Sequence, residues 1–210
     1  MKLEDYAKGG EKVEVDLKSF KDLIRGRVTI LFGAPMVGKT LFAHLLSREF
    51  DNPILLKVDN NYKDEYKEIN KKLKYIEITS PQQLLFQIKN LMVNVETLII
   101  IDSLTTSASD IIGERMYTSP RAFNELAQFY DAVFNRLAKF RGLATSLVIC
   151  HEKLLDFKTG EIGPRLNLVT LRNVDLVLRM VEEEGKRKIK VWRKREKVDP
   201  RSIEKVELEA

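Results

Sequence analysis

The chain has 210 residues, 44% of them hydrophobic and 32% charged, and it carries a formal net charge of +5. This composition is typical of a soluble globular domain, and the lack of any run of 18 apolar residues excludes a membrane-spanning helix. A single cysteine, Cys150, excludes a disulfide scaffold and a zinc site built from cysteines. Because residues 1–16 show no apolar signal segment, we expect a cytoplasmic protein.

Five short apolar runs rich in valine and isoleucine predict strands. They are continuous rather than alternating, which is typical of strands buried on both faces of a parallel sheet. These strands are expected at 28–32, 54–58, 75–78, 97–101 and 146–150.

Two helices are bounded by capping signals. Ser80-Pro81 is typical of an N-cap followed by proline at the first helical position, and Gln83 completes a capping box. The apolar face of this helix comprises Leu84, Leu85, Ile88, Leu91 and Met92. Ser119-Pro120 opens a second helix, which Gly142 follows. The alternation of strands and helices predicts an α/β fold, in which helices flank a mainly parallel sheet.

The last third of the sequence follows a different pattern. After Asp175, two strand-like runs surround a glycine turn, which predicts a C-terminal β-hairpin. Residues 186–197 hold eight basic residues and one acidic residue, a net charge of +7, so the other 198 residues sum to −2. Because concentrated positive charge can bind phosphate groups, this basic segment is a candidate anion-binding site.

The segment after the first strand matches a phosphate-binding loop. It reads G-x-x-x-x-G-K-[ST] without a mismatch and precedes an apolar helix. Its residues are Gly33, Ala34, Pro35, Met36, Val37, Gly38, Lys39 and Thr40. The glycines let backbone N–H groups surround phosphate oxygens at a helix N-terminus. Lys39 is expected to bridge the β- and γ-phosphates, and the Thr40 hydroxyl is expected to bind Mg²⁺.

A second acidic ligand for Mg²⁺ is predicted at the end of another strand. Residues 98–101 are four consecutive aliphatic residues, and Asp102 follows them. Asp102 would hold the metal directly or through water, and a helix-capping role is the structural alternative. Because the sequence contains no Asn-Lys-x-Asp motif for guanine, the expected nucleotide is ATP.

With these motifs the sequence resembles the ATPase core of the RecA/RadA recombinase superfamily, and in particular short archaeal RadA paralogues of the RadB type. The likeness covers roughly residues 16–208, including the closing strands at 166–195. It implies a single RecA-like ATPase domain over 1–210, with an N-terminal arm at 1–15 and C-terminal strands at 175–208. It also implies ATP at the carboxyl ends of the strands, as is general for open α/β sheets, and a function in DNA recombination or repair.

One departure from the family's pattern concerns hydrolysis. Where the family has a glutamate that activates the attacking water, the matching residue here is Asn61. An amide cannot accept a proton, so we expect weak or partner-dependent ATP hydrolysis unless Asp59, Asp64 or Glu65 takes over.

A second departure is Glu152, which stands where the family has a glutamine that contacts the γ-phosphate. We therefore count Glu152 with Lys39 and Asp102 as candidate catalytic residues. A carboxylate there would repel the phosphate unless it is protonated or bridged by Mg²⁺. The neighbouring His151 could supply a donor instead, or could be a hydrogen-bonded residue at the strand end.

The resemblance also bears on assembly and on DNA. Residues 1–20 lack the family's polymerisation peptide, and the similar spacing in 129–132 lies in a helix, which favours core packing. We expect a monomer or small oligomer without long filaments, with a RadA-like recombinase or another protein as partner. Arg115 and Arg165, in segments that resemble the family's two DNA-binding loops, are candidate nucleic-acid contacts.

The basic segment allows three interpretations. Alternation places Ile189 and Val191 on one face of a strand and, on the other, Lys188, Lys190, Trp192 and Lys194. That second face could follow a nucleic-acid backbone and stack a base, with single-stranded DNA favoured. The simpler interpretation is an edge strand whose lysines prevent aggregation. By resemblance to KaiC-like relatives, Arg193 and Arg195 could instead reach the nucleotide of a neighbouring subunit.

Two functions therefore stay open. The first is an ATP-binding protein of DNA recombination or repair. The alternative is a KaiC-like signalling module that binds ATP and protein partners and not DNA.

Overall fold

The computed structural model describes residues 16–58, 64–105, 121–166, 168–194 and 208–209. The helices are α1 (Leu17–Ile24), α2 (Lys39–Ser47), α3 (Pro81–Asn90) and α5 (Arg121–Leu137), with 3-10 turns η2 (Asp64–Glu68), η3 (Ala138–Phe140) and η4 (Leu168–Asn173). The strands are β1 (Val28–Gly33), β2 (Asn52–Lys57), β3 (Lys74–Glu77), β4 (Thr97–Asp102), β5 (Thr145–Asp156), β6 (Glu161–Pro164), β7 (Leu176–Glu183), β8 (Lys186–Lys194) and β9 (Leu208–Glu209). They form one sheet in the order β3-β2-β4-β5-β1-β7-β8-β9, and β6 pairs with β5 outside that path.

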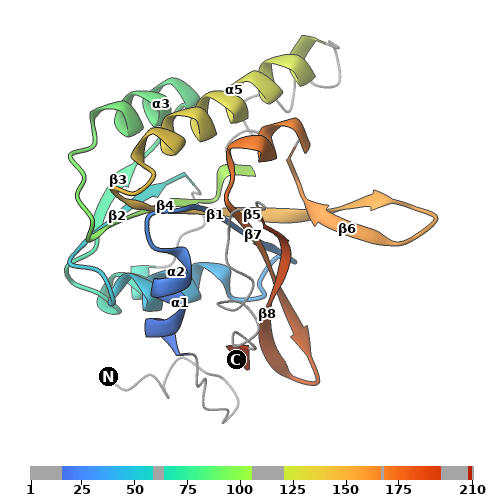
Figure 1. Cartoon of the computed structure of the whole chain (residues 1–210), viewed down its shortest axis with the longest axis horizontal. Helices are drawn as coiled ribbons and strands as arrows, with labels where there is room; N and C mark the ends of the chain where they lie inside the picture. Colours follow the sequence, from blue (N-terminus) through green and yellow to red (C-terminus); the bar gives the residue numbers. More distant parts are fainter. Residues whose placement is uncertain (1–15, 59–63, 106–120, 167, 195–207, 210) are drawn as a thin grey trace.

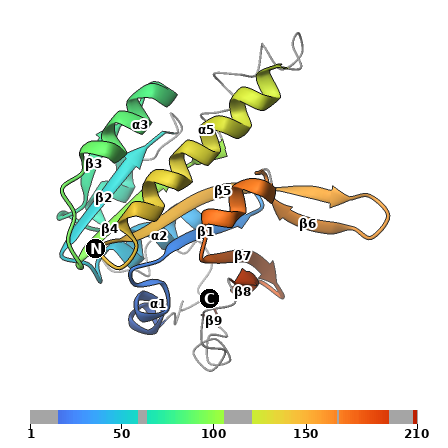
Figure 2. The same cartoon turned by 45° about the horizontal axis from the view of Figure 1, so that its top comes forward.

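Helices cover both faces of this sheet (Figures 1 and 2). Helices α3 and α5 lie on one face, and α1 and α2 lie on the other. From β3 to β7 the neighbouring strands pair in parallel, which confirms the predicted α/β class and brings their carboxyl ends to one edge. Among the described residues, no helix is long and apolar enough to cross a membrane.

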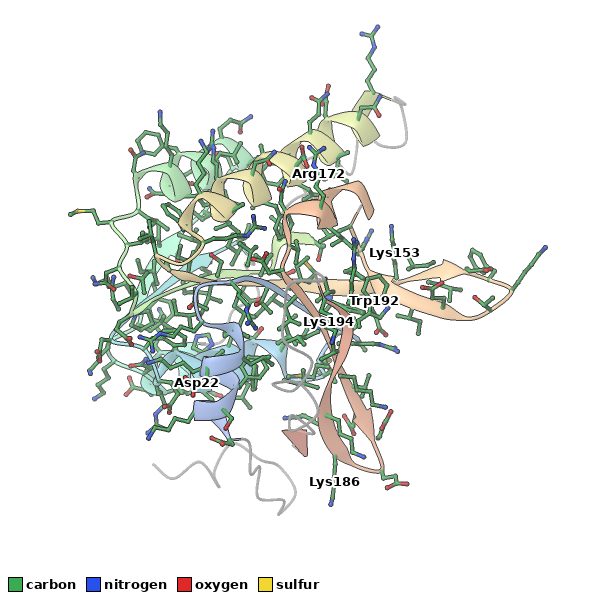
Figure 3. The ribbon with its side chains drawn as sticks, in the orientation of Figure 1. Asp22, Lys153, Arg172, Lys186, Trp192 and Lys194 are labelled. Atoms are coloured by element: carbon green, nitrogen blue, oxygen red, sulfur yellow. The ribbon has the colours of Figure 1, made fainter. Side chains whose placement is uncertain are left out.

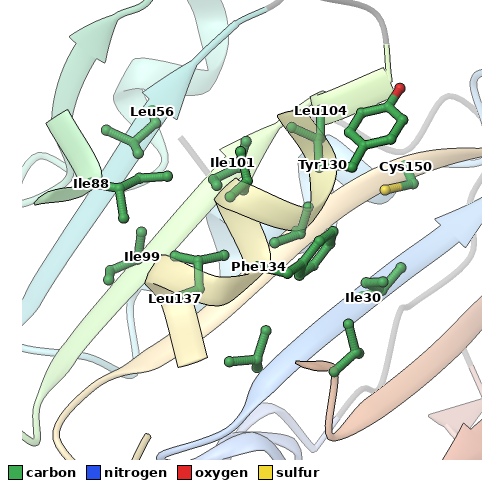
Figure 4. Packing of buried hydrophobic residues seen from close by; sticks show 14 of the residues in the cluster. Ile30, Leu56, Ile88, Ile99, Ile101, Leu104, Tyr130, Phe134, Leu137 and Cys150 are labelled. Atoms are coloured by element: carbon green, nitrogen blue, oxygen red, sulfur yellow. The ribbon is translucent and has the colours of Figure 1, made fainter. Parts of the chain in front are cut away.

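The central strands are buried on both faces, as their continuous apolar runs predict. In β4, Ile99 and Ile101 pack in the cluster beneath α5, whereas Leu98 and Ile100 pack in the cluster formed with α1 and α2. Figure 4 shows the first cluster, in which Phe134 of α5 lies over the sheet. Strand β4 is thus fixed from both sides, and the position of its last residue is fixed with it.

The predicted helix after Ser80 forms with one difference at each end. Ser80 Oγ accepts a hydrogen bond from the Gln83 N–H at 3.1 Å, as expected for an N-cap. The Gln83 side chain returns to the N–H of Thr79 rather than to that of Ser80. The prediction that Met92 belongs to the apolar face is wrong, because α3 ends at Asn90 and Met92 is 90% exposed.

The segment before Arg165, which the resemblance makes a DNA-binding loop, contributes strand β6. Strand β5 continues beyond the body of the sheet to Asp156, where it pairs antiparallel with β6. The resulting β5–β6 hairpin projects from the molecule (Figures 1 and 2). The sequence of β6 contains glycine and proline, which are poor strand formers, so the pairing with β5 decides its conformation.

Strands β7 and β8 form the predicted C-terminal hairpin. Its two-residue turn is Glu184-Gly185, and both residues have positive φ, as twisted hairpins favour. The pairing shifts from Leu178↔Val191 to Val177↔Arg193, so Trp192 is the additional residue of a bulge. The expected alternation of faces therefore holds through Trp192, which packs in the cluster opposite to that of Ile189, and is interrupted after it.

Candidate functional site

The loop between β1 and α2 has the backbone shape of an anion site. Gly38, the N-cap of α2, adopts a left-handed conformation with φ 102°, which a side chain rarely permits. It provides no side-chain oxygen for the first N–H groups of the helix, so these groups can bind an anion. These features fit the phosphate group that the motif predicts.

Gly33, the last residue of β1, allows β1 to pack closely against the backbone of β7. A Cβ atom at Gly33 would lie 2.4 Å from the carbonyl oxygen of Met180 and 3.3 Å from a methyl carbon of Val37. Gly33 is also paired in register with Met180 on β7 and with His151 on β5. The first glycine of the motif is therefore required for the close approach of β1 to the backbone of β7.

Lys39 is buried beneath the loop and is only 6% exposed. Its ammonium donates hydrogen bonds to the carbonyl oxygens of Gly33 at 2.9 Å and Ala34 at 2.7 Å. Burial lowers the pKa of Lys39 below its usual value of 10.5, and the carboxylates of Asp102 and Glu152 partly offset this effect. Asp102 and Glu152 thus both lie within electrostatic range of Lys39.

Asp102 ends β4 at the carboxyl edge of the sheet and is 6% exposed. Strand β5 lies between β4 and β1, so Asp102 is separated from the loop by one strand. Tyr66 of η2 completes this side of the site, and sequence analysis did not single it out. Burial raises the pKa of Tyr66 above its usual value of 10.0, and the negative charge of Asp102 adds to the effect.

Glu152 forms an ion pair that the sequence did not predict. Its Oε2 accepts hydrogen bonds from Nε of Arg179 at 3.2 Å and from Nη2 at 3.1 Å. The two residues come from β5 and β7, on either side of β1. The guanidinium of Arg179 thus compensates the negative charge of Glu152, so that neither protonation nor a metal ion is needed to do so. The neighbouring His151 donates its backbone N–H to Thr105 Oγ1 at 3.0 Å.

Arg187 is a further functional candidate that sequence analysis missed. Its guanidinium lies against Gly38, with Nη1 at 3.1 Å and Cζ at 3.3 Å from the position where a Cβ of Gly38 would stand. Alternation along β8 places Arg187 on the same face as the buried Ile189. An arginine on the buried face of a strand is the signal that could have identified it, because such a charge needs a partner.

The predicted row of nucleic-acid contacts on β8 is partly engaged within the protein. Lys190 hydrogen-bonds to Glu183, and Lys188 lies 3.9 Å from the same carboxylate. Trp192 packs edge-on against Phe32, with ring centroids 5.8 Å apart, on the face covered by α5. Lys194 is exposed. Figure 3 shows how Trp192 and Lys194 lie on β8.

The other predicted contacts are dispersed. Arg165 is exposed at the base of the β5–β6 hairpin. Burial lowers the pKa of Lys153, and the positive charge of the nearby Arg165 lowers it further. Arg193 is exposed on β8. Arg115, Arg195 and Asn61 lie outside the described residues.

Comparison with known proteins identifies the fold. The structure is similar to the crystal structure of the RadB recombinase with a TM-score of 0.62 and 14% sequence identity, over 90% of this chain and 92% of that chain. No family model matches the sequence, and no curated protein matches it either. The expected RecA-type fold is thereby confirmed, and at this identity the likeness concerns the fold alone.

Proposed function

We propose that this protein is a cytoplasmic ATP-binding protein of RecA/RadA type that acts in DNA recombination or repair, with weak or partner-dependent ATP hydrolysis. The observation that carries the proposal is the loop 33–40, whose lysine is buried beneath it while Asp102 ends β4, which is separated from β1 by β5 alone. We take residues 1–210 as a single RecA-like ATPase domain that works as a monomer or small oligomer, with a RadA-like recombinase as a candidate partner.

In this proposal each residue of the site has a separate role. Lys39 binds the β- and γ-phosphate oxygens together with the N–H groups at the start of α2. Thr40 and Asp102 hold Mg²⁺, which neutralises charge on the phosphates when it is bound. Glu152 lies on β5, one residue beyond the register partner of Gly33, where its carboxylate can accept a proton from water, and Arg179 orients it through two hydrogen bonds.

Slow turnover that depends on Glu152 is the expected result of a hydrolysis assay. Glu152→Gln keeps the shape of the side chain but cannot act as a base, so turnover should fall about a hundredfold or more while ATP affinity changes less than twofold. Release of phosphate is measured with and without single- and double-stranded DNA. Glu125→Gln, an exposed substitution on α5, is the matched control. Unchanged turnover in Glu152→Gln would remove Glu152 from the mechanism.

A KaiC-like module that binds protein partners and not DNA is the second candidate. The contacts of β8 favour it, because Glu183 engages two of the lysines and Trp192 packs against Phe32 instead of lying open for a base. The function in recombination is favoured by the general similarity to the RadB recombinase. A third role for the same strand, with Arg193 reaching a neighbouring subunit, requires an oligomer.

Titration of DNA against salt distinguishes the two candidates. If β8 contacts four or five phosphates of single-stranded DNA, log K should fall with log salt with a slope of about −3 to −4. Replacing Glu183 by glutamine frees Lys188 and Lys190 and should strengthen binding severalfold at low salt. The Lys188→Gln/Lys190→Gln double variant should reduce the slope by about 1.4, at about 0.7 per contact. Absence of binding at low salt in all three proteins would contradict a direct contact with DNA.

A further inference from the structure

The β7–β8 hairpin places a cation on the phosphate loop of its own chain. Nη1, Cζ and Nε of Arg187 lie 3.1, 3.3 and 3.4 Å from the position where a Cβ of Gly38 would stand. Three atoms of the guanidinium, rather than one, therefore face the space that a side chain of Gly38 would occupy. The absence of a side chain at Gly38 is what makes the contact possible.

Three other basic residues of the hairpin have acidic partners, whereas Arg187 is placed differently. Arg179 pairs with Glu152, and Lys188 and Lys190 pair with Glu183. Within the described ranges no carboxylate lies within salt-bridge distance of Arg187, although Glu182 is its register partner across the hairpin. A half-buried guanidinium on an anion-binding loop is in a position to receive a phosphate oxygen.

The surroundings of Arg187 are those of the nucleotide site. Gly38 immediately precedes the buried Lys39, and the N-terminus of α2 adds partial positive charge at the same place. Arg187 also lies close enough to Tyr66 of η2 to lower the pKa of that residue, against the larger effects of burial and of Asp102. Two cations and a helix N-terminus thus converge on the loop from different elements.

We propose that Arg187 binds the phosphate groups of the nucleotide in cis, as a second cation opposite Lys39. This inference rests on the proposed ATP site and adds a ligand residue to it. It also gives the hairpin a function that differs from the expected action of Arg193 and Arg195 on a neighbouring subunit. Arg187 lies two residues from Ile189, which packs in the core.

Three ligands and three variants test this inference. Arg187→Gln should weaken binding of ATP and ADP about tenfold to a hundredfold, because a hydrogen bond to a charged group is lost, and should leave adenosine within twofold. Arg187→Lys keeps the positive charge but lacks the paired N–H donors of a guanidinium, so it should retain part of the affinity for ATP and ADP. Lys186→Gln, at the exposed turn of the same hairpin (Figure 3), is the matched control and should bind all three ligands as the wild type does.

The outcomes separate this inference from the proposed function. Wild-type protein that binds no ATP would overturn both. A second outcome is that the wild type binds ATP and Lys39→Ala does not, while Arg187→Gln binds ATP within twofold of the wild type or more tightly. This outcome would overturn the role of Arg187 alone. Equal weakening of ATP and adenosine would show a structural effect rather than a phosphate contact, and would overturn it as well. Circular dichroism confirms that each variant is folded.

Discussion

Replacing Lys39 with alanine is expected to lower the affinity for ATP by about a hundredfold or more. The side chain is buried beneath the loop, and its ammonium is held by the carbonyls of Gly33 and Ala34, directly at the predicted phosphate position. A hydrogen bond to a charged group contributes about 1.5–3 kcal/mol, and Lys39 is expected to contact two phosphates. Calorimetric titration of ATP in the presence of Mg²⁺ measures the effect.

The control for Lys39→Ala must separate lost charge from lost structure. Lys39→Gln keeps a donor for the two carbonyls and should remain as stable as the wild type while still losing most of the affinity. Lys139→Ala removes an exposed lysine near the start of β5, at the opposite edge of the sheet, and should bind ATP normally. Normal affinity in folded Lys39→Ala would refute the assignment of the loop.

Gly33→Ala is expected to reduce the free energy of unfolding by about 3 kcal/mol, which is at the upper end for an overpacked site. The new Cβ would lie 2.4 Å from the carbonyl oxygen of Met180, far inside the ~3.3 Å at which carbon and oxygen normally touch. Because that oxygen belongs to the backbone of β7, β1 and β7 must separate at the start of the loop. For a chain of this size the melting temperature should fall by about 6–12 °C.

Gly160→Ala is the matched control for this experiment. Gly160 has a φ of 71°, but nothing lies within 4 Å of the position of its missing Cβ. Its substitution therefore adds backbone strain without a clash and should cost about 1–2 kcal/mol. A melting temperature of Gly33→Ala within 2 °C of the wild type would contradict the described packing of β1 against β7.

The parts of the fold that could be predicted from the sequence depend on local patterns. Residues 97–102 form a continuous apolar run that ends in an acid, and this is sufficient to predict a buried strand with Asp102 at its carboxyl end. The phosphate-loop motif is likewise local, because Gly33, Gly38 and Lys39 all lie within one short loop. The capping signal at Ser80 also acts within a few residues.

The parts that could not be predicted depend on residues that are distant in the sequence. Glu152 and Arg179 meet across β1, and nothing near either residue indicates the other. Arg187 shares its strand with the lysine row, and only the register of β7 and β8 places it beside Gly38. The bulge at Trp192 is also a property of that register, and so is the contact of the indole with Phe32.

The most direct test of the central proposal is calorimetric titration of the wild-type protein with ATP, with and without Mg²⁺, beside GTP and adenosine. We predict saturable binding of one ATP per chain, tighter with Mg²⁺ and much tighter than for adenosine, because the site is built around the phosphate groups. The absence of saturable ATP binding by the folded protein, or equal affinity for ATP and adenosine, would contradict the proposal.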